Sequence, residues 1–235
     1  MDNAIYAALT RQSGLMREMR SVANNMANSS TSGFRREGVV FSEHLTSLGR
    51  DTLSMANAHG REVDLSQAGL TQTGGTYDLA LESPGFFMVE TPQGNRLTRA
   101  GAFMTSAEGE LINPDGYRVL DEGQAPIALP PGARAVGVGA DGTISADGEP
   151  VGRVGVFDQP DPAKLRHVGG TLFDAEGAEP LPDAAVRQGF LEDSNVNPVH
   201  EIARMIEVQR AYELGQSFLD GEDQRIRAAI AAITR

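Results

Sequence analysis

The sequence contains no cysteine and no tryptophan, and aromatic residues make up only 6% of it. The absence of cysteine excludes disulfides, thiol nucleophiles and cysteine-ligated metal sites, while it leaves reducing and oxidising compartments equally open. The chain is not poor in apolar residues overall, because 40% of its 235 residues are hydrophobic. This length and composition are sufficient for a buried core and argue against global disorder.

Positive charge is scarce. The formal net charge is −12, and Lys164 is the single lysine. Residues 106–195 hold 16 acidic and 6 basic residues, so ten of the twelve net negative charges lie in this segment. Binding of nucleic-acid phosphates needs clustered cations, so nucleic acid is not an expected partner. The acidic middle of the chain is typical of a solvated exterior, whereas the two ends are nearly balanced.

Long hydrophobic runs are missing as well. The chain starts with Asp2 rather than a basic segment, and no continuous apolar stretch follows, so we expect no cleaved signal peptide. No run approaches the roughly 18–20 apolar residues that a membrane span needs. We therefore expect no direct membrane insertion.

Residues 3–27 have the pattern of an amphipathic helix about 37 Å long. Its apolar positions follow a 3-4 spacing, the pattern of a coiled-coil seam. The predicted seam residues are Ile5, Ala8, Gln12, Leu15, Met19, Val22 and Met26. Gln12 is the polar member of the seam, either at an edge that touches water or as a contact that fixes the register.

The helix is followed by a stretch rich in turn-forming side chains, which include Asn24, Asn25, Asn28, Gly33 and the lone aromatic Phe34. Asparagine and serine side chains compete for backbone hydrogen bonds and favour caps and turns. Residues 36–75 then show no strong period. We predict an irregular extended arm, with a short helix near residues 40–48.

From Thr76 the period changes to two, and glycine-containing turn pairs such as Asp141-Gly142 and Asp147-Gly148 separate short apolar runs. Asp-Gly between short alternating runs is a strong hairpin signal. This region therefore has the pattern of an all-β domain.

The chain becomes helical again after Asn197, a good N-cap residue, and Pro198, which suits the first helical position. A 3-4 rhythm continues for about 37 residues. The predicted assembly-interface positions of this stripe are Met205, Val208, Tyr212, Leu219, Ile226 and Ile233.

The predicted fold class is α+β, with long coiled-coil-like terminal helices that flank a central all-β domain and an irregular extended arm after the first helix. The predicted boundaries are an N-terminal helix at 1–27, a junction and arm at 28–75, a β domain at 76–188, and a C-terminal junction and helix at 189–235. Two paired helices bury only one face each, so the terminal helices are expected to take part in an assembly.

No motif indicates catalysis, a cofactor or a metal. Residues 137–142 match the glycine pattern of a dinucleotide site, but a strand pattern follows where that site needs a helix. Arg204 stands where a zinc-binding helix would need the partner of His200. The Asp-Gly pairs lack the spacing of a calcium loop. We therefore predict that the protein is not an enzyme and has no cofactor.

Three stretches, in order along the chain, carry a family resemblance. They are Ala23–Asn28 with Gly33-Phe34-Arg35, then Tyr77–Leu81 with Gly85-Phe86-Phe87 and Asn113–Tyr117, and finally Gly189–Pro198 with Gln209-Arg210-Ala211-Tyr212. Together they resemble the signatures of the rod, hook and hook-associated axial proteins of the bacterial flagellum. The length, the Met1-Asp2-Asn3 start and the single β domain are most similar to the proximal rod subunits, with the distal rod subunits as the alternative.

The resemblance implies a structural subunit of the basal-body rod, which polymerises through its terminal helices into the drive shaft that transmits torque from motor to hook. It implies helices that line an inner tube, β domains that face outward, and contacts with other rod subunits and adjacent axial proteins. It also implies export through the flagellar secretion system into the periplasm-spanning rod. To the seam residues it adds Asn24, Asn25, Asn28, Gly33, Phe34, Asn195, Asn197 and Gln209 as assembly-interface positions. A different class, an export adaptor or binding module, stays open, as does an acidic β-domain hydrolase.

Overall fold

The computed structural model describes residues 2–48 and 51–233, and the chain divides into two compact units. The first, here called the helical unit, comprises Met1–Ala27, Glu37–Glu62 and Asn197–Arg235. The second, here called the β unit, comprises Asn28–Arg36 and Val63–Val196. Each unit is built from segments that are distant in sequence.

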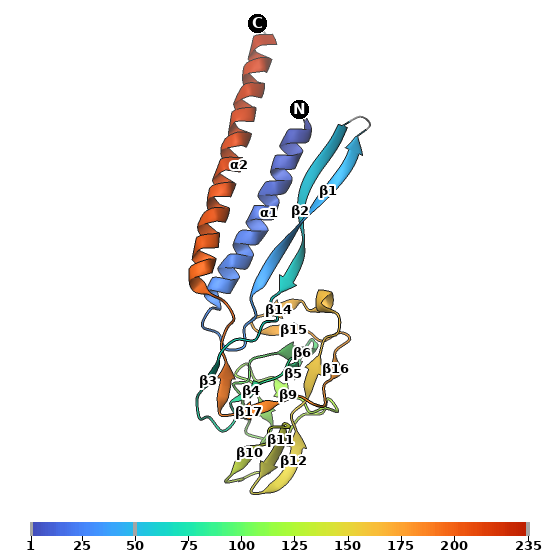
Figure 1. The fold of residues 1–235 in the computed structure, drawn as a ribbon, viewed down its shortest axis with the longest axis vertical. Coiled ribbons are helices and arrows are strands. Elements are labelled where there is room, and N and C mark those ends of the chain that lie inside the picture. The colour runs from blue at the N-terminus through green and yellow to red at the C-terminus, as the bar shows by residue number, and fades with distance from the viewer. Residues whose placement is uncertain (1, 49–50, 234–235) are drawn as a thin grey trace. The chain divides into compact units, whose positions relative to one another are not determined.

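The helical unit contains two long helices and two long strands. Helix α1 spans Asp2–Ala27 and helix α2 spans Pro198–Ile233, while strands β1 (Glu37–Leu48) and β2 (Asp51–Val63) pair in a two-stranded sheet. Figure 1 shows α1 between α2 and the two strands, which run in opposite directions. Helix α1 therefore packs on two sides.

The N-terminus of α2 is capped as predicted. The side-chain oxygen of Asn197 accepts hydrogen bonds from the backbone N–H groups of Val199 at 3.0 Å and His200 at 3.2 Å. Pro198 occupies the first helical position, where its missing N–H costs no hydrogen bond. The predicted cap is confirmed.

The predicted fold class is wrong in two respects, although the overall α+β content is correct. Residues 37–48 and 51–63 form strands rather than an irregular arm with a short helix. A coiled coil is not observed either, because α1 contacts both α2 and β1, and the seam positions Met26 and Ile226 are exposed. The irregular glycine spacing gave no strand pattern, and the two strands form a sheet by pairing with each other.

The β unit consists of short strands. Its largest sheet has nine strands, in the order β14-β15-β6-β5-β9-β8-β7, with β13 paired to β5 and β16. Separate small sheets are β10-β11-β12, β17-β4 and β18-β3. The strands are β3 (Leu70–Gln72), β4 (Leu79–Leu81), β5 (Phe86–Thr91), β6 (Gly94–Thr98), β7 (Met104–Thr105), β8 (Leu111–Ile112), β9 (Arg118–Val119), β10 (Val136–Val138), β11 (Thr143–Ala146), β12 (Glu149–Arg153), β13 (Val156–Asp158), β14 (His167–Gly169), β15 (Leu172–Asp174), β16 (Glu179–Pro180), β17 (Val186–Gln188) and β18 (Phe190–Glu192), and a 3₁₀ turn, η1, covers Pro162–Lys164.

Strand β5 lies at the centre of the core of the β unit because both of its faces are buried. Phe87 and Val89 belong to one apolar cluster, whereas Phe86 and Met88 belong to another. Successive side chains of a strand point to opposite faces, so β5 separates the two clusters. This explains the continuous apolar run 85–89 in the sequence.

The glycine pattern at 137–142 is a hairpin, as expected. Residues 136–138 form β10 and residues 143–146 form β11, and the two strands pair antiparallel from Val136–Ala146 to Val138–Ile144. Gly142 donates a backbone hydrogen bond to the carbonyl of Gly139 at 2.9 Å across the turn. No helix opens here to hold a pyrophosphate.

Candidate assembly surfaces

The contact between α1 and α2 brings several predicted seam residues together. Leu15 and Val22 of α1 and Val208 of α2 are buried. Ile5, Ala8, Met19, Met205, Tyr212 and Leu219 are partly buried, whereas Met26, Gln209 and Ile226 are exposed. The side chain of Ile233 lies outside the described part. The stripe is therefore covered in the middle of the helices and open toward both ends.

Gln12 lies in this contact and is buried, so it is not an edge residue that touches water. Its Nε2 donates to the backbone carbonyl of Tyr212 at 2.9 Å. The helices approach closely here, since a Cβ added to Gly215 would lie 2.6 Å from Gln12 Nε2. A residue larger than glycine at position 215 would push against the buried amide, so Gly215 and Gln12 fix how the two helices meet.

An ion pair joins the same two helices further along. Arg204 of α2 donates from Nε to Oε1 of Glu18 at 2.6 Å, and Glu18 is buried. Burial disfavours the charge on the guanidinium, but the hydrogen bonds and charges of Glu18 and Glu207 together outweigh this effect and raise the pKa of Arg204. The pattern of apolar residues gave no signal for this pair.

Asn25 is the asparagine of the N-terminal signature that is fully buried, whereas Asn24 is exposed. Its Oδ1 accepts from the backbone N–H of Glu37 at 2.9 Å, and its Nδ2 donates to the carbonyl of Glu37 at 2.8 Å. Nδ2 also donates to Oε2 of Glu201 at 3.2 Å. Asn25 thus fastens the start of β1 and the first turn of α2 to the end of α1.

The remaining positions of the N-terminal signature, Asn28, Gly33 and Phe34, lie in the β unit. Gly33 has a φ of +73°, and a Cβ there would lie 2.3 Å from the backbone nitrogen of Ala100. Phe34 is fully buried and stacks on His167 with ring centroids 5.3 Å apart. The carbonyl of Asn28 accepts the backbone N–H of Thr31 at 3.1 Å in the turn that precedes them.

Asn195 fastens two other segments of the β unit through its side chain. Its Oδ1 accepts the backbone N–H of Arg36 at 2.6 Å, and its Nδ2 donates to the carbonyls of Asp64 at 2.9 Å and Ser66 at 3.1 Å. Both asparagines therefore serve as substitutes for backbone partners. Such roles depend on the fold and leave no spacing signal in the sequence.

A buried charge cluster beside these segments was not predicted. Glu192 is fully buried between two arginines, with Oε1 2.5 Å from Arg35 Nη2 and Oε2 2.9 Å from Arg99 Nε. Ala68 also donates its backbone N–H to Oε1 at 3.0 Å. Burial lowers the pKa of Arg99 to about 10, and the neighbouring Glu192 opposes this shift. The three residues are 64 or more positions apart in sequence, so only the folded chain brings them together.

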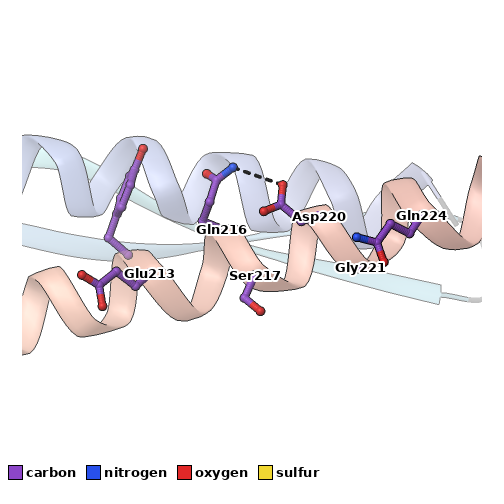
Figure 2. A pocket seen from close by; sticks show the side chains of 7 residues that line it. Glu213, Gln216, Ser217, Asp220, Gly221 and Gln224 are labelled. Carbon is purple, nitrogen blue, oxygen red and sulfur yellow. Dashed lines mark hydrogen bonds between the residues drawn. The ribbon is translucent and has the colours of Figure 1, made fainter.

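Two of the hollows on the described part of the helical unit differ in their lining. A groove of 550 Å³ between α1 and α2 is lined mainly by apolar side chains, including Leu15, Leu214 and Phe218, with Arg11 and Gln12. A second hollow, of 520 Å³, runs along α2 and has polar walls. Figure 2 shows its side chains, with Gln216 hydrogen-bonded to Asp220. Neither hollow contains the convergent charged groups of a catalytic site.

Within residues 2–48 and 51–233, no group of three or more His, Cys, Asp or Glu side chains could hold a metal ion. In the same described part, neither helix is long and apolar enough to cross a membrane.

Comparison with known proteins gives two family matches. Residues 80–146 match the flagellar hook protein FlgE/F/G D1 domain, and residues 187–232 match the flagellar basal body rod FlgEFG protein C-terminal region. The first match runs from within β4 to the end of β11, and the second runs from within β17 through β18 and nearly all of α2. These matches define the class as flagellar hook and rod proteins.

Full-length relatives agree. The chain is 38% identical to the flagellar basal-body rod protein FlgF of Caulobacter vibrioides, over 98% of this chain and 97% of the relative. It is 36% identical to FlgF of Mesorhizobium japonicum, over 91% of this chain and 90% of the relative. It is 27% identical to FlgG of Bacillus subtilis over 98% of both chains. The chain belongs to the flagellar hook and basal-body rod FlgE/F/G family.

Proposed function

We propose that the chain is a structural subunit of the flagellar basal-body rod, of the FlgF type found in the proximal rod. The observation that carries this proposal is the likeness to FlgF of Caulobacter vibrioides over nearly the whole of both chains. The FlgF relatives are 35–38% identical to the chain and the FlgG relatives 27–30%. This difference favours the FlgF type over the FlgG type.

In this proposal the terminal segments, 1–27 and 189–235, form the assembly domain, and the subunits polymerise into a shaft that transmits torque to the hook by packing, without catalysis. The exposed apolar side chains of both helices support it. Large ones on α2 include Val199, Ile206 and Leu214, which are 71%, 45% and 73% exposed. Exposed apolar patches that are rimmed by polar residues mark sites of protein contact. Its partners would be further rod subunits and adjacent axial proteins, reached after export by the flagellar secretion system.

Replacing the chromosomal gene by a tagged copy tests this function. Purified basal bodies should contain the tagged chain in a constant ratio to the other rod components, as determined by quantitative mass spectrometry. Deletion of the gene should abolish motility, and the tagged copy should restore it. A motile deletion strain, or a tagged chain absent from basal bodies, would rule out the proposed role.

A further inference from the structure

The β unit is completed by the last residues that the chain contributes to it. Among the described strands, β4 is paired with β17 alone and β3 with β18 alone. The backbone N–H of Gly33 also donates to the carbonyl of Glu192 at 2.7 Å. The first segment of this unit, Asn28–Arg36, and its last segment, residues 184–196, therefore meet in the fold.

The buried charge cluster takes one residue from each of three parts of the unit. Arg35 lies in the first segment, Arg99 follows β6 in the middle of the unit, and Glu192 ends β18 in the last segment. Arg35 and Glu192 are 157 positions apart in sequence. All three residues are buried, and the two guanidinium groups share one carboxylate, Oε1 with Arg35 and Oε2 with Arg99. The cluster therefore has an excess of positive charge.

The two arginines of the cluster repel each other. Burial is the main cause that lowers the pKa of Arg99 to about 10, and the charge of Arg35 lowers it further, whereas Glu192 acts in the opposite direction. Nη1 of Arg35 is buried without a hydrogen-bond partner in the part of the chain that the structure describes. Burial of Arg35 beside Arg99 without Glu192 would leave two like charges uncompensated, which is strongly unfavourable.

We infer that Glu192 is a latch for the β unit: the first segment docks only together with the last segment, because Glu192 compensates the charges of Arg35 and Arg99. Asn195 reinforces this coupling from the same segment, since its Oδ1 accepts the backbone N–H of Arg36 at 2.6 Å. The middle of the unit supplies Arg99 and does not need the latch to form its own strand pairs, such as β5 with β6.

The biological meaning of the latch rests on the proposed function. A chain that passes through an export channel has one end on each side of the channel until the passage is nearly complete. Arg35 and Glu192 then lie on opposite sides, whichever end leads. Neither side holds the complete latch, so the β unit of a chain in transit stays open and closes when both segments have arrived.

Pulsed hydrogen exchange during refolding of the full-length chain tests the latch. Peptides that cover residues 28–36 and 186–193 monitor the two segments, and peptides that cover β5 and β6 monitor the middle of the unit. The backbone N–H of Phe34 donates to the carbonyl of Thr31 at 3.1 Å, so the first segment contains a turn that could be protected alone. We expect the two segments to gain protection with one time constant, and not before β5 and β6. Protection of 28–36 ahead of 186–193 would overturn the inference.

Glu192→Gln and Arg35→Met separate a charge latch from an ordinary stabilising ion pair. Glu192→Gln should lower the protection of both segments about a hundredfold, because both buried arginines lose their counter-charge. Arg35→Met should lower it in the native chain, where it removes a partner of Glu192. In the Glu192→Gln chain the same change removes a like charge beside Arg99, and it should restore protection about tenfold. A further loss in the double variant would overturn the inference.

The single variant Arg35→Met should also uncouple the two segments in the refolding experiment. Its first segment carries no charge that needs Glu192, so residues 28–36 should gain protection before residues 186–193. One shared time constant in this variant would show that backbone contacts, and not the charges, couple the segments, and would overturn the role of Glu192. Arg166→Met is the matched control, because the side chain of Arg166 is 70% exposed, and it should change neither protection nor refolding.

The outcomes separate the latch from the proposed function. Refolding of the purified chain does not involve the rod, so its result decides on the latch alone. Absence of the native chain from basal bodies would overturn the proposed function and the meaning of the latch for export, while the coupling of the two segments within the chain would stand.

Discussion

Asn25 and Glu201 meet in the interior of the helical unit, 176 positions apart in sequence. The Nδ2 of Asn25 donates to the Oε2 of Glu201 at 3.2 Å, and the two residues are 0% and 1% exposed. The same amide pairs with the backbone of Glu37 at both its oxygen and its nitrogen. One side chain thus holds three segments of the unit together.

Asn25→Ala is expected to destabilise the helical unit by about 3 kcal/mol, because it leaves the buried N–H of Glu37 and the carboxylate of Glu201 without this partner. Asn24→Ala is the matched control, since Asn24 is exposed and adjacent, and we expect a change within about 0.5 kcal/mol. Chemical denaturation followed by circular dichroism at 222 nm monitors this unit, because both long helices belong to it. Equal losses for the two variants would contradict the proposed role of Asn25.

The sequence was sufficient to place both helices, because their apolar spacing and the Asn197-Pro198 cap are local signals. Short strands in the β unit were also predictable, since alternation and Asp-Gly turns lie within a few residues of each other. The prediction of an irregular arm at residues 37–63 was wrong for a physical reason. Strands β1 and β2 gain their hydrogen bonds from each other, and nothing in the glycine-punctuated sequence of either strand requires that partner.

The polar contacts of the candidate surfaces were less predictable than the elements that carry them. The signature drew attention to Asn25 and Asn195, but their partners are backbone groups that only the fold brings near. Arg35 and Glu192 lie in stretches that carry the family resemblance, but nothing in the sequence indicated that they pair with each other or with Arg99. A buried charge is identified by its surroundings, and a surface glutamate looks the same in sequence.

Glu192→Gln is expected to destabilise the β unit by about 3–5 kcal/mol, because it removes the anion that two buried arginines share. Hydrogen exchange of peptides that cover β5 follows the stability of the core of this unit. Glu179→Gln, on an exposed edge of the same unit, should stay within about 0.5 kcal/mol. Unchanged protection of β5 in Glu192→Gln would show that the cluster contributes little to folding.

Gly33→Ala and Gly116→Ala form a pair that separates backbone strain from steric conflict. Both glycines have a positive φ, +73° and +84°. An added Cβ would lie 2.3 Å from the nitrogen of Ala100 at Gly33, whereas at Gly116 nothing lies within 4 Å. We expect a loss of about 1 kcal/mol for Gly116→Ala and at least about 3 kcal/mol for Gly33→Ala, as determined by hydrogen exchange of the β unit. Similar losses would mean that the turn near Ala100 can move.

Asp64 should make the stability of the β unit depend on pH at the acid end. Burial raises the pKa of this carboxyl, but hydrogen bonds from Ser66 and the charges of Arg36 and Arg35 together lower it below its ordinary value of 3.8. A depressed pKa means that the unfolded chain binds the proton more readily. The stabilisation is therefore present above pH 3.8 and is lost as the pH falls through the folded-state pKa. Asp64→Asn should flatten the acid dependence of unfolding below pH 4, and a slope equal to that of the native chain would contradict this assignment.

Leu15→Asp and Leu9→Asp should separate folding of the helical unit from assembly. Leu15 is 8% exposed in the contact with α2, so an aspartate there loses apolar burial and brings an unpaired charge inside, at a cost of about 4 kcal/mol. Leu9 is 50% exposed, and the same change there should leave the helical signal at 222 nm and its denaturation midpoint nearly unchanged. It should nevertheless lower incorporation into basal bodies, because the proposed function uses the exposed apolar side chains of both helices as contacts with other rod subunits. A Leu9→Asp chain that is incorporated at the native level would argue against the exposed face of α1 as an assembly contact, whereas a Leu15→Asp chain with native stability would argue against the packing of α1 on α2.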